Sequence, residues 1–182
     1  MVASYYPIKR NIYQSHSIAY HQMPCIRKNQ INQVQPKNIH ALQVRRQFAS
    51  KDILDGDVIP LSSIQCAIGS DIQYDLYKNE ISFLRKGVYV IYFAFHVLPI
   101  ERNKVLIELQ GTKTPTHVYA TAGVESELKA VLLSQTTVLN VNDIYEKYHF
   151  VNQSSGPIRF VEVVGTTIND SFTGIVTIYR ME

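Results

Sequence analysis

The chain has 182 residues, of which 46% are hydrophobic and 18% charged, and its formal net charge is +3. This length suits about one domain with an appendage, and the charged fraction lies below the roughly 25% of ordinary domains. The longest apolar run, Val88 to Phe95, is far too short for a membrane-spanning helix, and the first 22 residues lack the apolar stretch of a signal peptide. A low charge fraction fits a protein that covers much of its surface, for instance against copies of itself.

The distribution of charge predicts an extended N-terminal arm over residues 1–50. This segment holds seven basic and no acidic residues, whereas residues 51–182 hold 11 basic and 15 acidic ones. Pro7, Pro24 and Pro36 interrupt the arm, and no apolar stripe of helical period is sustained. Such a segment cannot bury enough apolar surface to offset its ordering entropy. We therefore expect a basic arm that becomes ordered only where it lies on another surface.

One short strand is predicted within the arm. Leu42, Val44, Arg46 and Phe48 alternate with their neighbours in the stretch "LQVRRQF". An extended arm can add a strand to an exposed sheet edge of the next subunit. We expect Leu42, Val44 and Phe48 to make that contact.

The chain has two cysteines, Cys25 in the arm and Cys66 in the body. Two thiols at this separation match no zinc-binding pattern. Two free or buried thiols are the simpler interpretation, and a disulfide is the alternative. Because one cysteine lies in each part of the chain, such a bond could join neighbouring subunits.

Residues 51–182 form the predicted body, a series of short strand patterns separated by turn residues. A hairpin is expected around "KNE" at residues 78–80, and a long strand follows from residue 87 to residue 98. Later strand patterns occur in "VLIELQG", "KAVLLSQTTVLN", "EKYHFV", "PIRFVEVVG" and "GIVTIYRME". About eight to ten strands at this spacing, without a convincing helix, predict an antiparallel sandwich or barrel.

The strand at residues 87–98 is apolar on both of its faces. One face carries Tyr89, Ile91, Phe93, Phe95 and Val97, and the other carries Val88, Val90, Tyr92, Ala94 and His96. We expect one face to meet the opposite sheet and the other to meet a neighbouring subunit, while coverage by the arm or a loop is the alternative. The predicted interface residues of this strand are Tyr89, Ile91, Phe93, Phe95, Val88, Val90 and Tyr92.

No catalytic constellation is visible in the sequence. The chain contains no G-x-S-x-G motif and no phosphate-binding glycine loop, and its six histidines do not form a metal pair. Asp55 and Asp57 flank Gly56, but a plain acidic turn is favoured over a calcium site, which needs 6–8 oxygen ligands. His96 is interpreted as a satisfied core histidine. We predict no enzymatic activity, cofactor, metal or small-molecule substrate.

The order of these patterns resembles the jelly-roll domain of the complement-subcomponent and tumour-necrosis-factor superfamily. The opening strand "GDVIPLSS", the Gly-x-Tyr strand with Gly87 and Tyr89, the turn at Asn142 and Asp143, and the closing "GIVTIYRME" carry the likeness over about residues 57–182. The bacterial form in collagen-like exosporium proteins is the most similar, although no collagen-like stretch precedes this body. The resemblance implies an all-β, antiparallel jelly-roll β-sandwich with an extended N-terminal arm. It also implies trimers in which one sheet face packs around the threefold axis.

Three functions remain open on these grounds. The first is a self-assembling structural protein of a cell or spore surface, made without a classical signal peptide, whose subunits are joined through the arm into a trimer or filament. The second is a trimeric receptor- or glycan-binding head of the same superfamily. The third is a viral capsid protein with a nucleic-acid-binding arm. Seven charges spread over 50 residues are few for neutralising packaged nucleic acid, so the third is the least favoured.

Overall fold

The computed structural model describes residues 39–46, 51–101, 104–113, 118–125, 128–161 and 173–181. In these segments every regular element is a β-strand, and no helix is present that could cross a membrane. The prediction of an all-β fold is confirmed. The strands are β1 (Ala41–Arg46), β2 (Ser63–Ile68), β3 (Ile72–Asp75), β4 (Glu80–Phe83), β5 (Gly87–Pro99), β6 (Lys104–Gly111), β7 (Val118–Glu125), β8 (Val131–Val141), β9 (Lys147–Asn152), β10 (Ile158–Phe160) and β11 (Gly174–Met181).

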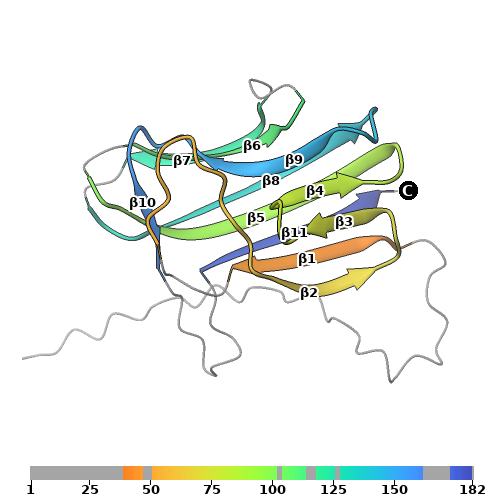
Figure 1. Ribbon diagram of the computed structural model, residues 1–182, viewed down its shortest axis with the longest axis horizontal. Helices are drawn as coiled ribbons and strands as arrows, with labels where there is room; N and C mark the ends of the chain where they lie inside the picture. The colour runs from red at the N-terminus through yellow and green to blue at the C-terminus, as the bar shows by residue number, and fades with distance from the viewer. Residues whose placement is uncertain are drawn as a thin grey trace, which may run out of the picture.

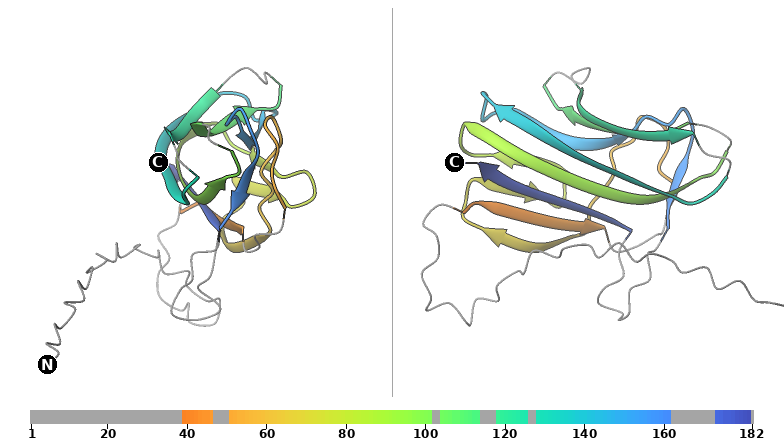
Figure 2. Two further views of the ribbon diagram at one scale, coloured as in Figure 1. Left: turned by 90° about the vertical axis from the view of Figure 1, so that its left-hand side faces the viewer. Right: turned by 180° about the vertical axis from the view of Figure 1, so that it is seen from behind.

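The strands form two antiparallel sheets that stack as a sandwich (Figure 1). Sheet A has the order β2–β1–β11–β5–β8, and β10 pairs with the last residues of β5. Sheet B has the order β3–β4–β9–β6–β7. Consecutive pairs such as β3 and β4 alternate in the sheets with pairs that are distant in sequence, such as β1 with β11 and β4 with β9, which is the connectivity of a jelly roll. The end-on view in Figure 2 shows the two sheets enclosing a common interior.

One face of β5 supplies the centre of the hydrophobic core, as the sequence predicts. The side chains of Tyr89, Ile91, Phe93, Phe95 and Val97 are completely buried. They pack against the inner face of sheet B, where the Phe93 ring centroid lies 4.9 Å from that of Phe150. Offset and edge-on aromatic contacts of this kind add to the stability gained from area burial.

Gly87 and Tyr89, the two residues of the Gly-x-Tyr pattern, lie at the start of β5. Gly87 has φ of 151°, a conformation that side-chain-bearing residues rarely adopt, and a Cβ there would lie 3.1 Å from the Arg180 guanidinium. The Tyr89 hydroxyl donates a hydrogen bond of 2.7 Å to the Arg85 carbonyl. The ring can therefore fill the core without leaving its polar atom unsatisfied.

Strand β1 belongs to the sandwich, although it lies on the N-terminal side of the boundary expected at residue 50. It pairs with β11 on one side and with β2 on the other. Leu42 and Val44 are 2% and 1% exposed and lie in the core of their own chain. This placement corrects the expectation that they contact a neighbouring subunit. The sandwich therefore includes residues 41–46, which were predicted from the sequence to belong to the arm.

The acidic turn at residues 55–57 is held by backbone amides. The Asp57 carboxylate accepts a hydrogen bond from the Leu54 amide, and Asp55 accepts one from the Ser155 amide. The segment that follows runs beside β9, with Val58 bridged to Val151. The Asp57 carboxylate thus closes the turn, and the Asp55 carboxylate ties the turn to the loop that follows β9.

Tyr74 makes the stability of the fold sensitive to alkaline pH. Burial raises the pKa of the Tyr74 phenol to about 12, and its oxygen accepts from the Leu61 amide and donates to Asn79 Oδ1. Because the unfolded pKa is near 10, the contribution is complete below pH 10 and is lost between pH 10 and pH 12, by roughly 2–3 kcal/mol. Urea titrations at pH 8, 10 and 11.5 should show this loss, with a shallower decline for Tyr74→Phe than for the exposed control Tyr145→Phe. Equal declines in the two variants would contradict it.

Candidate assembly face

The outward-pointing side chains of sheet A form one continuous surface, which we call the assembly face. Residues paired across an antiparallel sheet project to the same side, so the registers of the pairs define this set. Arg45 is the only member of this four-strand set that carries a permanent charge, and Arg159 of the adjoining strand β10, paired with Leu98, projects to the same side at the end of the sheet. The set consists of Ala41, Gln43 and Arg45 of β1; Ile175, Thr177, Tyr179 and Met181 of β11; Val88, Val90, Tyr92, Ala94 and His96 of β5; and Leu132, Ser134, Thr136, Val138 and Asn140 of β8.

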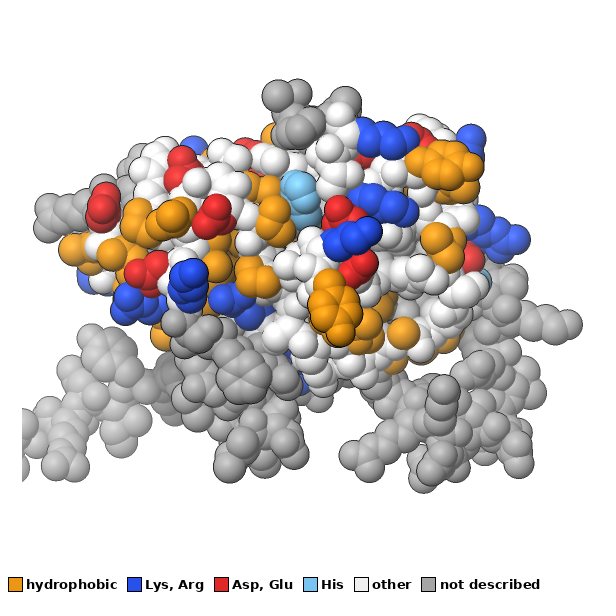
Figure 3. Space-filling model, viewed as in Figure 1, with side chains coloured by type: hydrophobic (Ala, Val, Ile, Leu, Met, Phe, Trp, Pro, Cys, Tyr) orange, Lys and Arg blue, Asp and Glu red, His pale blue; other side chains and the backbone are white. Residues whose placement is uncertain are grey.

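The outer face of sheet B has a different character. Asp75, Glu80, Glu108, Lys147 and His149 project from it. Figure 3, seen from the side of β3, β4 and β9, shows acidic and basic side chains spread over this surface. A face rich in charge is well solvated. Burying the outer side of sheet A against another molecule should therefore cost less desolvation free energy than burying the outer side of sheet B.

Large apolar side chains are exposed on the assembly face. Val138 is 63% exposed, Met181 49%, Leu132 42% and Val88 37%. At the middle of the face Val90 and Ala94 are already buried by their neighbours. Several exposed apolar side chains on one sheet face, with no charge at the centre of that face, are typical of protein–protein contact sites.

His96 lies on the assembly face and is only half buried, which differs from the core position that the sequence indicates. Its Nδ1 lies 3.1 Å from the Val161 carbonyl oxygen. Because a carbonyl can only accept, Nδ1 carries the proton. His149, on the outer face of sheet B, has its pKa lowered by burial, with an opposing influence from Glu80.

The predicted interface residues separate into three groups. Val88, Val90 and Tyr92 lie on the assembly face. Tyr89, Ile91, Phe93 and Phe95, like Leu42 and Val44, lie in the core of the same chain and are covered by its own second sheet. Phe48 lies outside the described residues, so its predicted contact is not placed by the structure.

The cysteine prediction is resolved for only one of its two residues. Cys66 on β2 is disulfide-bonded, so the interpretation of two free thiols does not hold for it. Cys25 and the rest of the arm up to residue 38 lie outside the described residues. A bond between neighbouring subunits stays a prediction.

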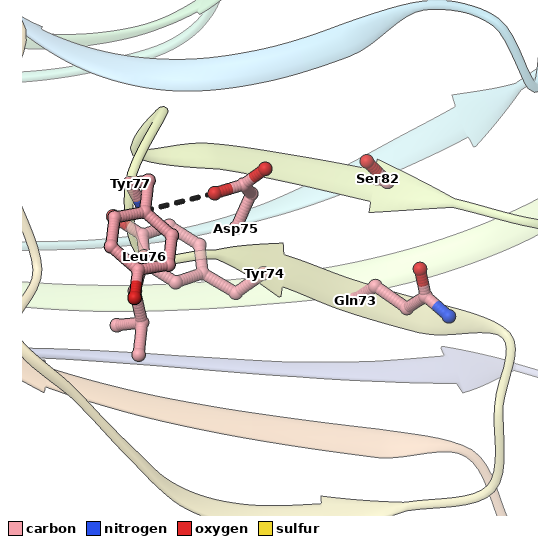
Figure 4. A pocket seen from close by; sticks show the side chains of 6 residues that line it. All are labelled: Gln73, Tyr74, Asp75, Leu76, Tyr77 and Ser82. Atoms are coloured by element: carbon pink, nitrogen blue, oxygen red, sulfur yellow. Dashed lines mark hydrogen bonds between the residues drawn. The ribbon is translucent and has the colours of Figure 1, made fainter.

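A shallow hollow of about 470 Å³ lies on the β3–β4 hairpin. Figure 4 shows Leu76 and Tyr77 at the turn, with Asp75 bonded to the Tyr77 amide and with Gln73 and Ser82 farther along the strands. Tyr77 is 99% exposed and projects into solvent. The hollow is open, and we call it the hairpin hollow.

A second hollow, of about 310 Å³, lies where β7, the end of β8 and the start of β9 meet. It is lined by Tyr119, Asn140, Asn142, Asp143, Glu146 and Tyr148, and we call it the β8–β9 hollow. Sequence reasoning identified Asn142 and Asp143 only as turn residues. The other four lie on three strands and on the turn before β9, and nothing in their sequence spacing indicates that they lie close together.

Comparisons with known proteins find likeness in three dimensions only. No family model matches the chain, and no curated protein matches its sequence. Solved structures similar to it include the globular domain of zebrafish complement 1qA protein (TM-score 0.52, 12% identity, covering 78% of this chain and 95% of that one). The Eiger TNF of S. frugiperda is similar with a TM-score of 0.60 and 9% identity, covering 79% of this chain and 93% of that one. Murine APRIL at pH 5.0 is similar with a TM-score of 0.58 and 5% identity, covering 79% of this chain and 100% of that one. The described chain therefore has the jelly-roll fold of complement C1q and tumour-necrosis-factor domains.

Proposed function

We propose that the chain is a non-enzymatic binding head that assembles as a homotrimer through the assembly face. The observation that carries this proposal is the near absence of charge on that face, set against the charged outer side of sheet B. The fold adds support, because the solved structures similar to this chain are heads of the complement and tumour-necrosis-factor type. Of the functions open from the sequence, a trimeric binding head fits these observations better than a structural role at a spore surface.

The physical argument rests on where the apolar surface lies. Val138, Leu132 and Met181 lie toward the periphery of the assembly face, and Tyr92 and Thr177 are opposite each other near its middle. Covering these side chains with a second copy removes apolar area from water without leaving a buried charge, except at Arg45 near the β2 side. Burial of apolar area is the dominant favourable contribution to association of this kind.

A single charge placed on the assembly face tests the proposal. Val138→Asp puts a carboxylate on an exposed side chain that faces outward, so the isolated fold should tolerate it. In the assembly the carboxylate would be buried without a partner, at a cost on the order of 3–5 kcal/mol. Light scattering coupled to size-exclusion chromatography should give three chain masses for the full chain and one for the variant.

Leu76→Asp is the matched control. Leu76 is an exposed aliphatic residue at the β3–β4 turn, away from sheet A, so this variant should keep the mass of the parent chain. The proposal fails if the parent chain is monomeric at all concentrations. It also fails if the two variants dissociate equally.

Removal of the arm separates the proposal from arm-joined assembly. If the assembly face holds the subunits together, deletion of residues 1–38 leaves the oligomer unchanged. If the arm joins them, large assemblies vanish in the deletion variant. Electron microscopy of both chains would show which outcome occurs.

A further inference from the structure

The β8–β9 hollow has a buried carboxylate at its base. Glu146 is only 7% exposed, and its Oε1 accepts a hydrogen bond of 3.0 Å from the Lys113 amide. Gly111 makes this placement possible, because a Cβ at that position would overlap Glu146 Oε1. The carboxylate is therefore fixed by its surroundings before any ligand arrives, which lowers the entropic cost of binding.

Aromatic and carboxamide groups complete the walls. The rings of Tyr119 and Tyr148 meet edge to face with centroids 5.0 Å apart. Burial raises the pKa of the Tyr148 phenol above its usual range, so the group is a neutral hydroxyl at physiological pH. Asn140 and Asn142 are exposed at the rim. Carboxamides and phenols each donate and accept hydrogen bonds, whereas carboxylates only accept.

The charges around the hollow disfavour ionic ligands. An anion would be repelled by Glu146 and by Asp143 at the rim. A metal ion is disfavoured because the Asp143 carboxylate is already engaged by Lys113 Nζ at 2.7 Å and by the Tyr145 amide at 2.8 Å. The Lys113 ammonium itself would repel a second cation. Among the described residues no group of three or more His, Cys, Asp and Glu side chains is placed to hold a metal.

We propose that the β8–β9 hollow binds a neutral saccharide, with Glu146 and Asn142 bonding its hydroxyl groups and the tyrosine walls contacting its apolar carbon–hydrogen faces. A sugar ring presents hydroxyls that both donate and accept, which matches the mixture of groups in the walls. The volume lies at the lower end of the range for small-molecule sites, roughly 300–1,000 Å³, and suits one or two sugar rings. The inference rests on the proposal that the chain is a binding head. The two bonding residues, Glu146 and Asn142, belong to a single copy and lie outside the assembly face, which the hollow meets only at Asn140.

Saturation-transfer NMR of the full chain with neutral methyl glycosides of the common hexoses, 6-deoxyhexoses and N-acetylhexosamines tests the inference. At least one glycoside should bind, and its dissociation constant should rise about tenfold in Asn142→Ala, which removes one rim carboxamide. Glu146→Gln should weaken binding further. Glu146 is buried, so the circular dichroism spectrum of this variant is compared with that of the parent chain. If the variant does not fold, the test relies on Asn142→Ala alone.

Gln73→Ala is the matched control, since it removes an exposed carboxamide from the hairpin hollow instead. It should leave the dissociation constant unchanged. The inference is overturned if no glycoside binds, or if binding is lost in Gln73→Ala and kept in Asn142→Ala. Light scattering on the same samples separates the two proposals: a monomer that binds the sugar contradicts only the trimer, and a trimer that binds none contradicts only the saccharide site.

Discussion

Phe95→Ala is expected to lower the free energy of unfolding by about 3–5 kcal/mol, the cost of truncating a large buried aromatic residue. Phe95 is completely buried, and its ring meets those of Phe93, Phe150 and Phe160 at centroid distances of 5.8, 5.3 and 5.7 Å. These rings come from β5, β9 and β10, so one side chain links both sheets. The change is measured by urea unfolding at fixed protein concentration. Phe95→Leu, which keeps most of the volume, should cost less than about 1.5 kcal/mol.

Gly174 provides a sharper test of the same packing. It pairs with Phe95 across β5 and β11, and a Cβ at residue 174 would lie only 2.5 Å from Phe95 Cδ1. Gly174→Ala alone should therefore destabilise the chain by about 1–3 kcal/mol through overpacking. In the Phe95→Ala background the added methyl group has space, and its cost should largely disappear. Additive effects of the two substitutions would contradict this account of the core.

The alternation of apolar residues was sufficient to predict an antiparallel sandwich or barrel, because it reports directly on burial in a strand, whereas the jelly-roll topology was implied by the resemblance to a known superfamily. The core face of β5 and the β3–β4 hairpin follow from residue patterns that are local in sequence. The assignment of β1 to an arm that contacts a neighbouring subunit was wrong for a physical reason. Three of the six residues of β1, Gln43, Arg45 and Arg46, are polar, so the segment has the composition of an arm. The structure places Arg46 on the core side, 5% exposed, with its guanidinium 4.5 Å above the Phe160 ring and bonded to the Pro60 carbonyl.

The candidate sites were less predictable than the fold, because they depend on which strands become neighbours. Two apolar faces on β5 indicated an extra contact surface, but not which residues of β8 and β11 would extend it. Nothing in the local sequence distinguishes Glu146 from an ordinary acidic residue beside a turn. Its burial depends on Gly111, 35 positions earlier in the chain, through the pairing of β6 with β9. No local pattern carries information of that kind.

Asp71→Ala is expected to destabilise the chain by about 2–3 kcal/mol, since it leaves a largely buried arginine without its carboxylate. Asp71 is 7% exposed and lies just before β3, and its Oδ2 is 2.8 Å from Arg180 Nη1 near the end of β11. Arg85, on the turn between β4 and β5, lies 3.9 Å from the same oxygen. His40 Nδ1 lies 3.4 Å from the Asp71 amide nitrogen and 3.5 Å from Asp71 Oδ1, and Arg180, at 2.8 Å, is the nearest counter-charge. One carboxylate thus connects the segments leading into β1 and β3 with the turn before β5 and the end of β11.

The exposed pair of Asp52 and Arg159 is the control for Asp71. Its nitrogen–oxygen distance is 2.7 Å, but both side chains are solvated, so Asp52→Ala should have little effect on unfolding. The double variant Asp71→Leu with Arg180→Met should be less destabilised than the sum of its two single variants, because it removes both charges together. Urea titrations of the parent chain, Asp71→Leu, Arg180→Met and the double variant measure these free energies of unfolding. If the two single effects simply add, Asp71 does not act through Arg180, and the connection between the strand ends has another origin.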